Sequence, residues 1–190
     1  MLDFIRIACA VPAVRVGDTA KNAEDICAYI EKADGERADI VLFPELALTG
    51  YSCQDLFFQD TLWTGVQQGI RKIADCTKDH PNITAAVGLP VRTGMRMYNC
   101  AAVISRGKIH ALVPKTYIPN YNEFYEKRWF SSGAEVTEDL AELLGEPVPV
   151  LPRAVFRVGG TLLGVEICED MWTPLPPSTF LALNGAEVIL

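Results

Sequence analysis

Apolar residues recur along the first half of the chain with two different periods, which predict alternating strands and helices. Three short runs rich in apolar and β-branched residues predict strands, namely 5–11, 39–43 and 83–89. One helix is expected from a cap at Asp18 or Thr19 to the Asp-Gly pair at 34–35, and another over roughly 61–78. The positions expected on the buried stripes are Ala20, Ala23, Ile26, Cys27, Ile30 and Ala33, then Leu62, Val66, Ile70, Ile73 and Ala74.

The pattern changes in the second half of the chain, where pairs of apolar runs are separated by glycine-containing turns. These runs predict two hairpins, 97–105 with 108–113 and 154–158 with 161–168. The turn of the first hairpin is expected to be the three-residue connection "RGK". A helix over 177–183 and a strand from 187 follow. The alternation of strands and helices predicts an α/β fold in which helices are layered on a sheet.

A long segment, residues 114–152, connects the two hairpins. It contains five prolines and the aromatic-rich stretch "YIPNYNEFYEKRWF". A connection of this length inside a compact domain is usually functional or disordered. Because its aromatic content argues against disorder, we expect this segment to have a function.

Composition and charge narrow the class of protein. The chain has 190 residues, of which 49% are hydrophobic, with a formal net charge of −7. We therefore expect a single domain, 1–190, and no nucleic-acid partner, because binding to phosphates needs clustered Lys and Arg. No run approaches the roughly 18 apolar residues of a membrane span, and the N-terminal segment does not read as a signal peptide. The six cysteines form no CxxC pair and no Cys/His cluster, so we expect a cytoplasmic protein with neither a zinc site nor a disulfide framework.

Three polar side chains stand where apolar strands end: Glu45 after "VLFP", Lys115 after "ALVP" and Cys168 after "GVEI". Ligands bind beyond the strand ends of sheets flanked by helices, so we expect these groups to converge. A thiol with a pKa of about 8.5 is mostly protonated at neutral pH, and a nearby glutamate can remove the proton during attack. The lysine and the backbone N–H of Glu169 would stabilise the anion that develops on a carbonyl oxygen.

Each of these residues also has a purely structural interpretation. Taken singly, Glu45 is typical of a turn or helix-capping acid, Lys115 of a solvated charge at a hairpin end, and Cys168 of a small buried hydrophobe. Strand alternation argues against the last interpretation. It places Cys168 on the polar face together with Gly164 and Glu166, opposite the apolar face formed by Leu163, Val165 and Ile167.

A metal site is disfavoured at the same turn. The candidate ligands would be Glu166, Cys168, Glu169 and Asp170. Alternation sends their side chains to different faces, and neither of the two histidines, His80 and His110, is near in the sequence.

Three sequence blocks carry a resemblance to a known family. The blocks "FPELALTGY" (43–51), "PKTYIPNYNEFYEKRWF" (114–130) and "GVEICEDMW" (164–172) resemble the signature blocks of the nitrilase superfamily of carbon-nitrogen hydrolases, whose catalytic set is Glu, Lys and Cys. Within that superfamily, "TGYSCQDLFFQ" and "VEICEDMW" point to the N-terminal glutaminase domains of glutamine-dependent NAD synthetases. The resemblance implies an αββα four-layer sandwich.

The resemblance also implies a reaction and a role for each matched residue. Glu45 would accept the thiol proton of Cys168, which attacks the side-chain amide of glutamine, while Lys115 holds the oxyanion. Glu126 matches a second glutamate that supports the lysine, although without the match it would be read as a surface acid. Tyr121 and Glu169 match positions that line the glutamine pocket, although Tyr121 alone would be read as ordinary aromatic packing. No metal or organic cofactor is implied for this half-reaction.

The family pattern extends beyond this chain. It adds further sandwich residues and a synthetase domain that would use ATP and magnesium, so the chain resembles a truncated domain. We therefore expect weak glutaminase activity or none from the 190 residues alone, and self-association as in the family. Two rival interpretations are another amidohydrolase of the superfamily, such as an ω-amidase or a carbamoyl hydrolase, and a non-catalytic interaction module that buries an open sheet edge against a partner.

Overall fold

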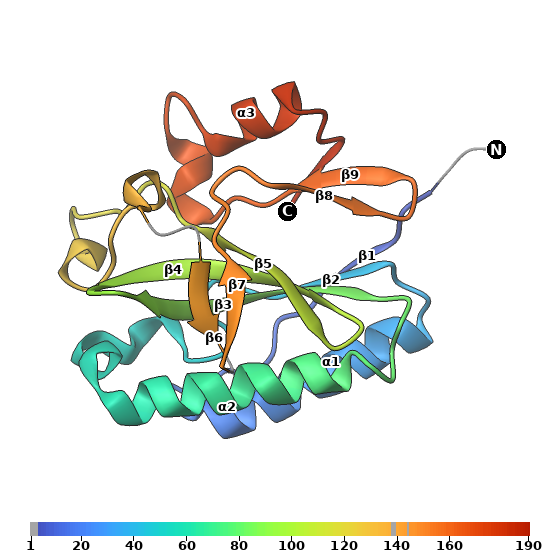
Figure 1. Ribbon diagram of the computed structural model, residues 1–190, viewed down its shortest axis with the longest axis horizontal. Coiled ribbons are helices and arrows are strands. Elements are labelled where there is room, and N and C mark those ends of the chain that lie inside the picture. The colour runs from blue at the N-terminus through green and yellow to red at the C-terminus, as the bar shows by residue number, and fades with distance from the viewer. Residues whose placement is uncertain (1–3, 138–139, 144) are drawn as a thin grey trace.

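The computed structural model describes residues 4–137, 140–143 and 145–190 of the chain. It is built of layers, and Figure 1 shows two long helices on one side, two β-sheets in the middle and a short helix on the other side. This is the α/β sandwich of the expected αββα type. No helix in the described ranges is both long and apolar enough to cross a membrane.

The larger sheet has the strand order β1-β2-β3-β4-β5. Its strands are β1 (Ile7–Cys9), β2 (Ile40–Leu42), β3 (Thr84–Thr93), β4 (Arg96–Ser105) and β5 (Lys108–Pro114). The first three strands run parallel, and β3, β4 and β5 are antiparallel neighbours. Parallel neighbours need a crossover connection, and the two long helices supply it.

Those helices, α1 (Thr19–Gly35) and α2 (Asp60–Cys76), pack on the outer face of the larger sheet. Asp18 caps α1 by accepting a hydrogen bond from the Lys21 backbone N–H at 3.0 Å. Of the two predicted capping residues, Asp18 and Thr19, the cap is therefore Asp18. The predicted stripe of α2 is buried throughout. In α1 the prediction was wrong at Ala20, which is exposed because Thr19, Asn22 and Ala23 form the buried face at this end of the helix, and Cys27 is only half-buried. The buried stripes and the sheet form the main apolar core.

The second sheet has the order β10-β9-β8 and lies on the other face of the first. It consists of β8 (Val155–Val158), β9 (Thr161–Gly164) and β10 (Val188–Ile189), with β9 and β10 parallel. A separate cluster fills the space between the two sheets, namely Ala101, Val103, Val113, Val165 and Ile167. Helix α3 (Pro177–Leu183) covers β9, where Leu181 packs against Gly164 so closely that a Cβ there would lie 2.7 Å from Leu181 Cδ1.

Long irregular segments connect these elements. After β2 the chain forms the 3₁₀ segment η1 (Tyr51–Phe58), and after β5 it forms η2 (Glu126–Arg128) and η3 (Gly133–Glu135). The rest of the predicted long segment contains a small hairpin, β6 (Leu140–Leu143) with β7 (Glu146–Pro149). The turn after β9 is η4 (Cys168–Trp172).

Several strand boundaries differ from the sequence prediction, and β3 extends to Thr93 instead of 89. The β4–β5 hairpin turns through two residues, Arg106 and Gly107, both with positive φ, because Ser105 already pairs with Lys108. Strand β9 ends at Gly164 instead of 168, and Gly164, expected on the polar face, is buried against Leu181 of α3. Strand β1 covers only Ile7–Cys9 of the predicted 5–11.

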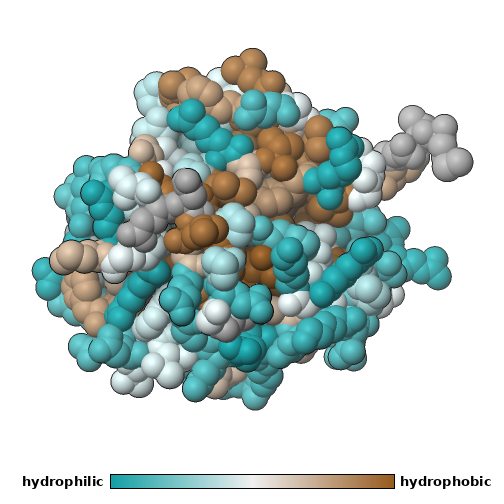
Figure 2. Space-filling model, in the orientation of Figure 1, coloured by the Kyte–Doolittle hydropathy of each residue, from teal (hydrophilic) through white to brown (hydrophobic). Residues whose placement is uncertain are grey.

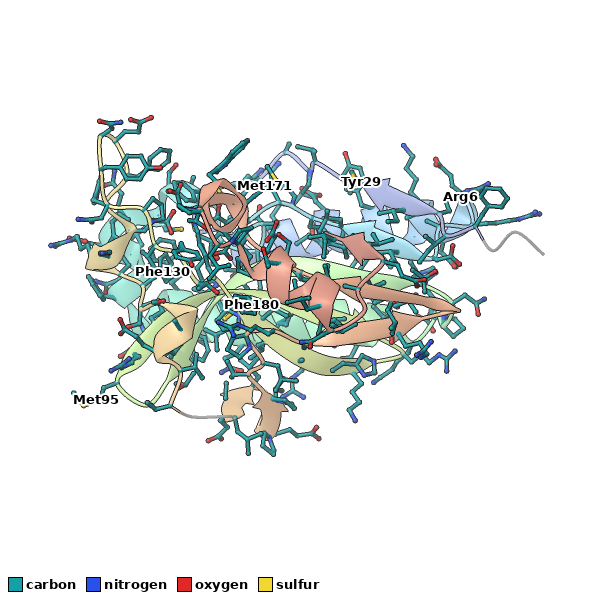
Figure 3. All side chains as sticks on the ribbon, turned by 90° about the horizontal axis from the view of Figure 1, so that it is seen from above. Arg6, Tyr29, Met95, Phe130, Met171 and Phe180 are labelled. Carbon is teal, nitrogen blue, oxygen red and sulfur yellow. The ribbon has the colours of Figure 1, made fainter. Side chains whose placement is uncertain are left out.

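The surface differs between the two sides of the sandwich. Figure 2 shows apolar side chains gathered over the part of the molecule that carries α3 and the β8–β9 hairpin. The exposed apolar residues there include Met171, Trp172, Leu175 and Leu183. From above, Phe180 lies over the body of the molecule, whereas Met95 projects from the β3–β4 connection at its edge (Figure 3).

Candidate active site

Glu45 lies in a tight turn directly after β2. Leu46 has a φ of 52°, so the chain reverses sharply just past the glutamate. The turn rests on Gly88 of β3, where a Cβ would lie 2.5 Å from the Pro44 carbonyl oxygen. Gly88 is therefore needed for the close approach of the two backbones, which brings the Glu45 carboxylate to the strand ends.

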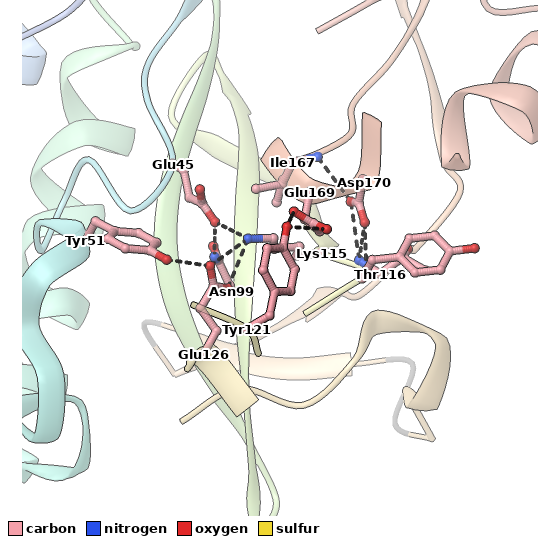
Figure 4. Close-up of polar contacts among 11 residues, drawn as sticks. Glu45, Tyr51, Asn99, Lys115, Thr116, Tyr121, Glu126, Ile167, Glu169 and Asp170 are labelled. Atoms are coloured by element: carbon pink, nitrogen blue, oxygen red, sulfur yellow. Dashed lines mark hydrogen bonds and ion pairs between the residues drawn. The ribbon is translucent and has the colours of Figure 1, made fainter. Parts of the chain in front are cut away.

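Lys115, the first residue after β5, lies at the centre of the cluster shown in Figure 4. Its Nζ donates to Glu45 Oε1 at 2.7 Å and to Glu126 Oε1 and Oε2 at 2.9 and 3.0 Å. The side chain is 0% exposed. A buried ammonium is tolerated only with such partners, and here two carboxylates surround it.

Glu126, from the long aromatic segment, reaches the same cluster with a side chain that is 2% exposed. Its Oε1 also accepts a hydrogen bond from the Tyr51 hydroxyl at 2.7 Å. Burial raises the pKa of the Glu126 carboxyl, although Lys115 and Tyr51 oppose that shift. Burial and the contact with Glu126 raise the pKa of Tyr51 as well, so this hydroxyl remains a proton donor.

Asn99 of β4 is a further member of the cluster. Its Nδ2 donates to Glu45 Oε1 at 2.5 Å, while its backbone carbonyl accepts from the Lys115 backbone N–H at 2.8 Å. The residue is 1% exposed, and its Oδ1 has no hydrogen-bond partner among the described residues. Asn99 therefore fixes both the carboxylate of Glu45 and the backbone of Lys115.

Cys168 begins the turn η4 with a φ of 48°, a backbone conformation rare for a residue with a side chain. The turn is held by the buried carboxylate of Asp170, which accepts backbone N–H groups from Ile167 at 3.1 Å, Thr116 at 3.0 Å and Tyr117 at 2.7 Å. Since Thr116 follows Lys115 directly, Asp170 ties the cysteine turn to the lysine. Cys168 itself is exposed.

The electrostatics of the cluster keep the thiol protonated and the lysine charged. Although the residue is exposed overall, partial burial of its thiol first and the charge of Glu45 second raise the pKa of Cys168, and Lys115 only partly opposes them. For Lys115, burial lowers the pKa, but the two carboxylates outweigh that effect and raise it. A nucleophilic attack by Cys168 therefore needs a base, and Glu45 lines the same cavity as the thiol.

Two cavities adjoin this cluster. Glu45 and Cys168 line the smaller one, about 150 Å³, which extends between the two sheets past Gly88 and Val165. Tyr121 and Glu169 line the larger one, about 630 Å³, together with Lys127, Ser131 and Ser132. The Tyr121 hydroxyl donates to the Glu169 carboxylate at 2.9 and 2.8 Å.

The structure thus places the residues singled out in the sequence in two groups. Glu45, Lys115 and Glu126 are in direct contact and Cys168 lines the cavity of Glu45, while Tyr121 and Glu169 face the neighbouring cavity. Three further members were missed, namely Tyr51, Asn99 and Asp170. The signal for Asn99 was an amide inside an otherwise apolar strand, and Tyr51 and Asp170 both fall inside the quoted sequence blocks.

The polar groups at the η4 turn are engaged in protein contacts. The Glu166 carboxylate accepts the Ser178 backbone N–H at 2.9 Å, and Asp170 is occupied by three backbone donors. Across residues 4–137, 140–143 and 145–190, no three His, Cys, Asp or Glu residues gather as metal ligands would.

Comparison with known sequences gives a consistent match. The family model described as carbon-nitrogen hydrolase matches residues 6–190. Curated relatives named glutamine-dependent NAD(+) synthetase include one from Mycobacterium leprae (strain TN), 35% identical over 188 residues, and one from Xylella fastidiosa (strain Temecula1 / ATCC 700964), 39% identical over 191 residues. The matches cover 98% and 100% of this chain but 28% and 32% of those proteins, so the chain spans about a third of their length or less.

Solved structures share the fold. Glutamine-dependent NAD+ synthetase from Acinetobacter baumannii, solved with adenosine diphosphate, superposes with a TM-score of 0.79 at 25% identity, covering 97% of this chain and 31% of that one. An amidase from Nesterenkonia sp. superposes with a TM-score of 0.73 at 22% identity, covering 97% of this chain and 63% of that one, which shows the fold alone. With the family model matched over almost its whole length and the sandwich fold in common, the chain belongs to the carbon-nitrogen hydrolase family.

Proposed function

We propose that this chain carries the catalytic site that hydrolyses the side-chain amide of glutamine through a thioester on Cys168, and we expect only weak turnover, or none, from the 190 residues alone. The observation that carries the proposal is the position of the Lys115 ammonium, buried between Glu126 at 2.9 Å and Glu45 at 2.7 Å, the latter lining the cavity of Cys168. Amide hydrolysis by a thiol needs a carboxylate base to take the thiol proton, a cation to stabilise the oxyanion, and the thiol itself. The names of the curated relatives support glutamine as the substrate.

The reaction begins when Glu45 accepts the proton of the Cys168 thiol as the sulfur attacks the amide carbonyl. Oxygen Oε1 of Glu45 is engaged by Asn99 and Lys115, so Oε2 is the oxygen assigned to the proton. Lys115 and the Glu169 backbone N–H stabilise the oxyanion. Glu45 returns its proton to the leaving ammonia, and water then cleaves the γ-glutamyl thioester, with Glu45 taking one of its protons.

Glu126 keeps Lys115 charged while Glu45 changes protonation state. When Glu45 takes the thiol proton it becomes neutral, and Lys115 loses one of its two counter-charges. Glu126 still contacts Nζ through both carboxylate oxygens. The ammonium therefore stays fixed and charged at the moment when the oxyanion forms.

The larger cavity is assigned to the amino-acid end of glutamine. Glu169 lies in it next to Cys168 in the chain, and its carboxylate would pair with the substrate ammonium, with Tyr121 holding it in place. No metal or organic cofactor is assigned to this reaction.

The names of the curated relatives also support a use for the released ammonia. The ammonia would serve NAD synthesis from deamido-NAD in a synthetase domain of the parent chain, and ATP and magnesium belong to that domain. A cytoplasmic location is supported by six free cysteines, because disulfides are rare in that compartment. Self-association is supported by the exposed apolar residues near α3 and is tested by sedimentation.

The test is labelling of Cys168 with an electrophilic glutamine analogue, followed by peptide mapping, alongside ammonia release from glutamine. We expect Cys168 to be labelled, glutamine to protect it, and Glu45→Gln to slow labelling by about 100-fold or more. Buried Cys100 is the internal control, since burial raises the pKa of its thiol. Equal labelling of Cys100 and Cys168, or protection by ω-amides or N-carbamoyl amino acids but not by glutamine, would refute the proposal.

A further inference from the structure

Two cysteines that have no part in the proposed reaction lie side by side on the outer helices. Cys27 belongs to α1 and Cys76 to the last turn of α2, and these helices pack against each other under the larger sheet (Figure 1). Cys76 Sγ lies 3.9 Å from the Cys27 carbonyl oxygen, and Cys27 Sγ lies 3.9 Å from the Lys72 carbonyl oxygen. Both thiols are free.

The two thiols differ in acidity because of their surroundings. The neighbouring Cys27 side chain lowers the pKa of Cys76 to about 7, and nearby His80 also lowers it while burial opposes the shift. The same contact and burial raise the pKa of Cys27. Cys76 is thus the nucleophilic thiolate of the pair, and Cys27 keeps its proton.

The residues around the pair favour the thiolate on Cys76. His80 Nδ1 contacts the Asp34 carboxylate at 2.9 Å, and this hydrogen bond raises the pKa of His80. An imidazolium at this position stabilises a thiolate on Cys76, while Asp79 and Glu31 act in the opposite direction.

The pair is also accessible. Cys27, Cys76 and His80 line a shallow surface hollow of about 750 Å³ between the middle of α1 and the C-terminal end of α2. Both cysteines are half-buried, whereas Cys53 and Cys100 are buried in the core at 2% and 0% exposure. A small oxidant can therefore reach Cys76, and Cys27 lines the same hollow.

We propose that Cys27 and Cys76 form a peroxide-reactive dithiol, which oxidises to a disulfide that cross-links α1 and α2. The Cys76 thiolate attacks one oxygen of hydrogen peroxide, breaks the O–O bond and becomes a sulfenic acid, while hydroxide leaves. The Cys27 thiol then attacks that sulfur, the S–S bond forms, and the sulfenic oxygen leaves as water. Two thiols and one peroxide thus give one disulfide and two waters.

The test uses the Cys168→Ala protein, so that the exposed cysteine of the candidate active site does not compete for peroxide. After treatment with limited peroxide and blocking of the remaining thiols, non-reducing peptide mapping should find one linked peptide pair containing Cys27 and Cys76. The intact mass should fall by two hydrogens, and the thermal midpoint should rise by several degrees and return with dithiothreitol, since the cross-link closes a long loop.

Matched variants separate this pair from other cysteines. Cys27→Ser and Cys76→Ser should each abolish the linked peptide, whereas Cys9→Ser, at an exposed cysteine of β1, should leave it unchanged. Cys27→Ser should also leave Cys76 as a sulfenic acid that a dimedone-type reagent captures. The proposal fails if wild-type thiols 27 and 76 stay separately alkylatable after peroxide treatment, or if both overoxidise without forming the linked peptide.

Discussion

Loss of the Asn99 side-chain amide is expected to lower activity strongly while changing stability little. The Asn99→Leu variant tests this expectation. Leucine has nearly the shape of asparagine, so the buried position between β3 and β5 stays filled. The substitution removes the 2.5 Å hydrogen bond to Glu45 Oε1 and, with it, the carbonyl Oδ1 that has no partner among the described residues. Loss of the hydrogen bond destabilises the folded protein, whereas loss of the buried carbonyl oxygen without a partner stabilises it.

The magnitudes follow from these contacts. A hydrogen bond to a charged group contributes about 1.5–3 kcal/mol, and a buried polar atom left unpaired costs about 1–3 kcal/mol. The free energy of unfolding of Asn99→Leu should therefore stay within about 1.5 kcal/mol of wild type. Activity should fall by about 10- to 100-fold, because Lys115 alone then orients the Glu45 carboxylate and a misplaced base is slow.

Two assays on the same preparations decide the matter. Urea unfolding gives the free energy of unfolding, and the rate of Cys168 labelling by the glutamine analogue gives the activity. Asn99→Asp is the matched control, since it keeps the shape but places a carboxylate against Glu45, and it should lower the labelling rate further. A labelling rate for Asn99→Leu within about threefold of wild type, or a stability loss above about 3 kcal/mol, would refute the reasoning.

Three further predictions concern the same cluster. Glu126→Gln should lower kcat by about 10- to 100-fold with little change in KM, because Lys115 loses its permanent counter-charge, and steady-state ammonia release measures it. Gly88→Ala should lower the free energy of unfolding by about 1–3 kcal/mol and should also slow the labelling of Cys168, because the new Cβ overlaps the Glu45 turn. Gly35→Ala is the control and should change neither quantity, because the space around its Cβ is open. Alkylation of Cys168 by iodoacetamide should rise with pH at more alkaline values than that of a free thiol such as N-acetylcysteine, because burial and a neighbouring carboxylate raise its pKa. A pH profile that coincides with that of the free thiol would contradict this.

Periodicity predicted the elements that pack on the main core. The strands and helices up to β3 were found where apolar runs and stripes indicated them, because burial on one side or both fixes those patterns. The β3–β4 hairpin was missed beyond residue 89, since Pro90 interrupts the strand pattern. Only Thr84, Ala85 and Ala86 of β3 pair with β2, so Pro90 lies where β3 is already an edge toward β2 and its missing N–H breaks no ladder.

The candidate site was partly readable from strand ends. That rule singled out Glu45, Lys115 and Cys168, because side chains just past apolar strands gather at one edge of a sandwich. Glu126 could not be found in this way, since it lies in an irregular segment whose path no periodicity describes. Its position was implied only by the family resemblance, and its catalytic role stays a prediction. Asp170 was considered only as a ligand of a disfavoured metal site, and its carboxylate accepts hydrogen bonds from three backbone N–H groups.

The order of the strands explains why these particular residue types lie where they do. The strands β2, β3, β4 and β5 are neighbours in that order. Glu45 follows the end of β2, Gly88 lies in β3, Asn99 lies in β4, and Lys115 follows the end of β5. The carboxylate and the ammonium come from strands separated by two others, so their 2.7 Å contact requires that nothing bulky stand between them. A glycine on β3 lets the Glu45 turn approach, and an amide on β4 bridges the remaining gap while carrying no charge of its own. A charged residue at position 99 would upset the balance around Lys115, and an apolar one would leave Glu45 less firmly held, so the sheet itself determines how the base is positioned.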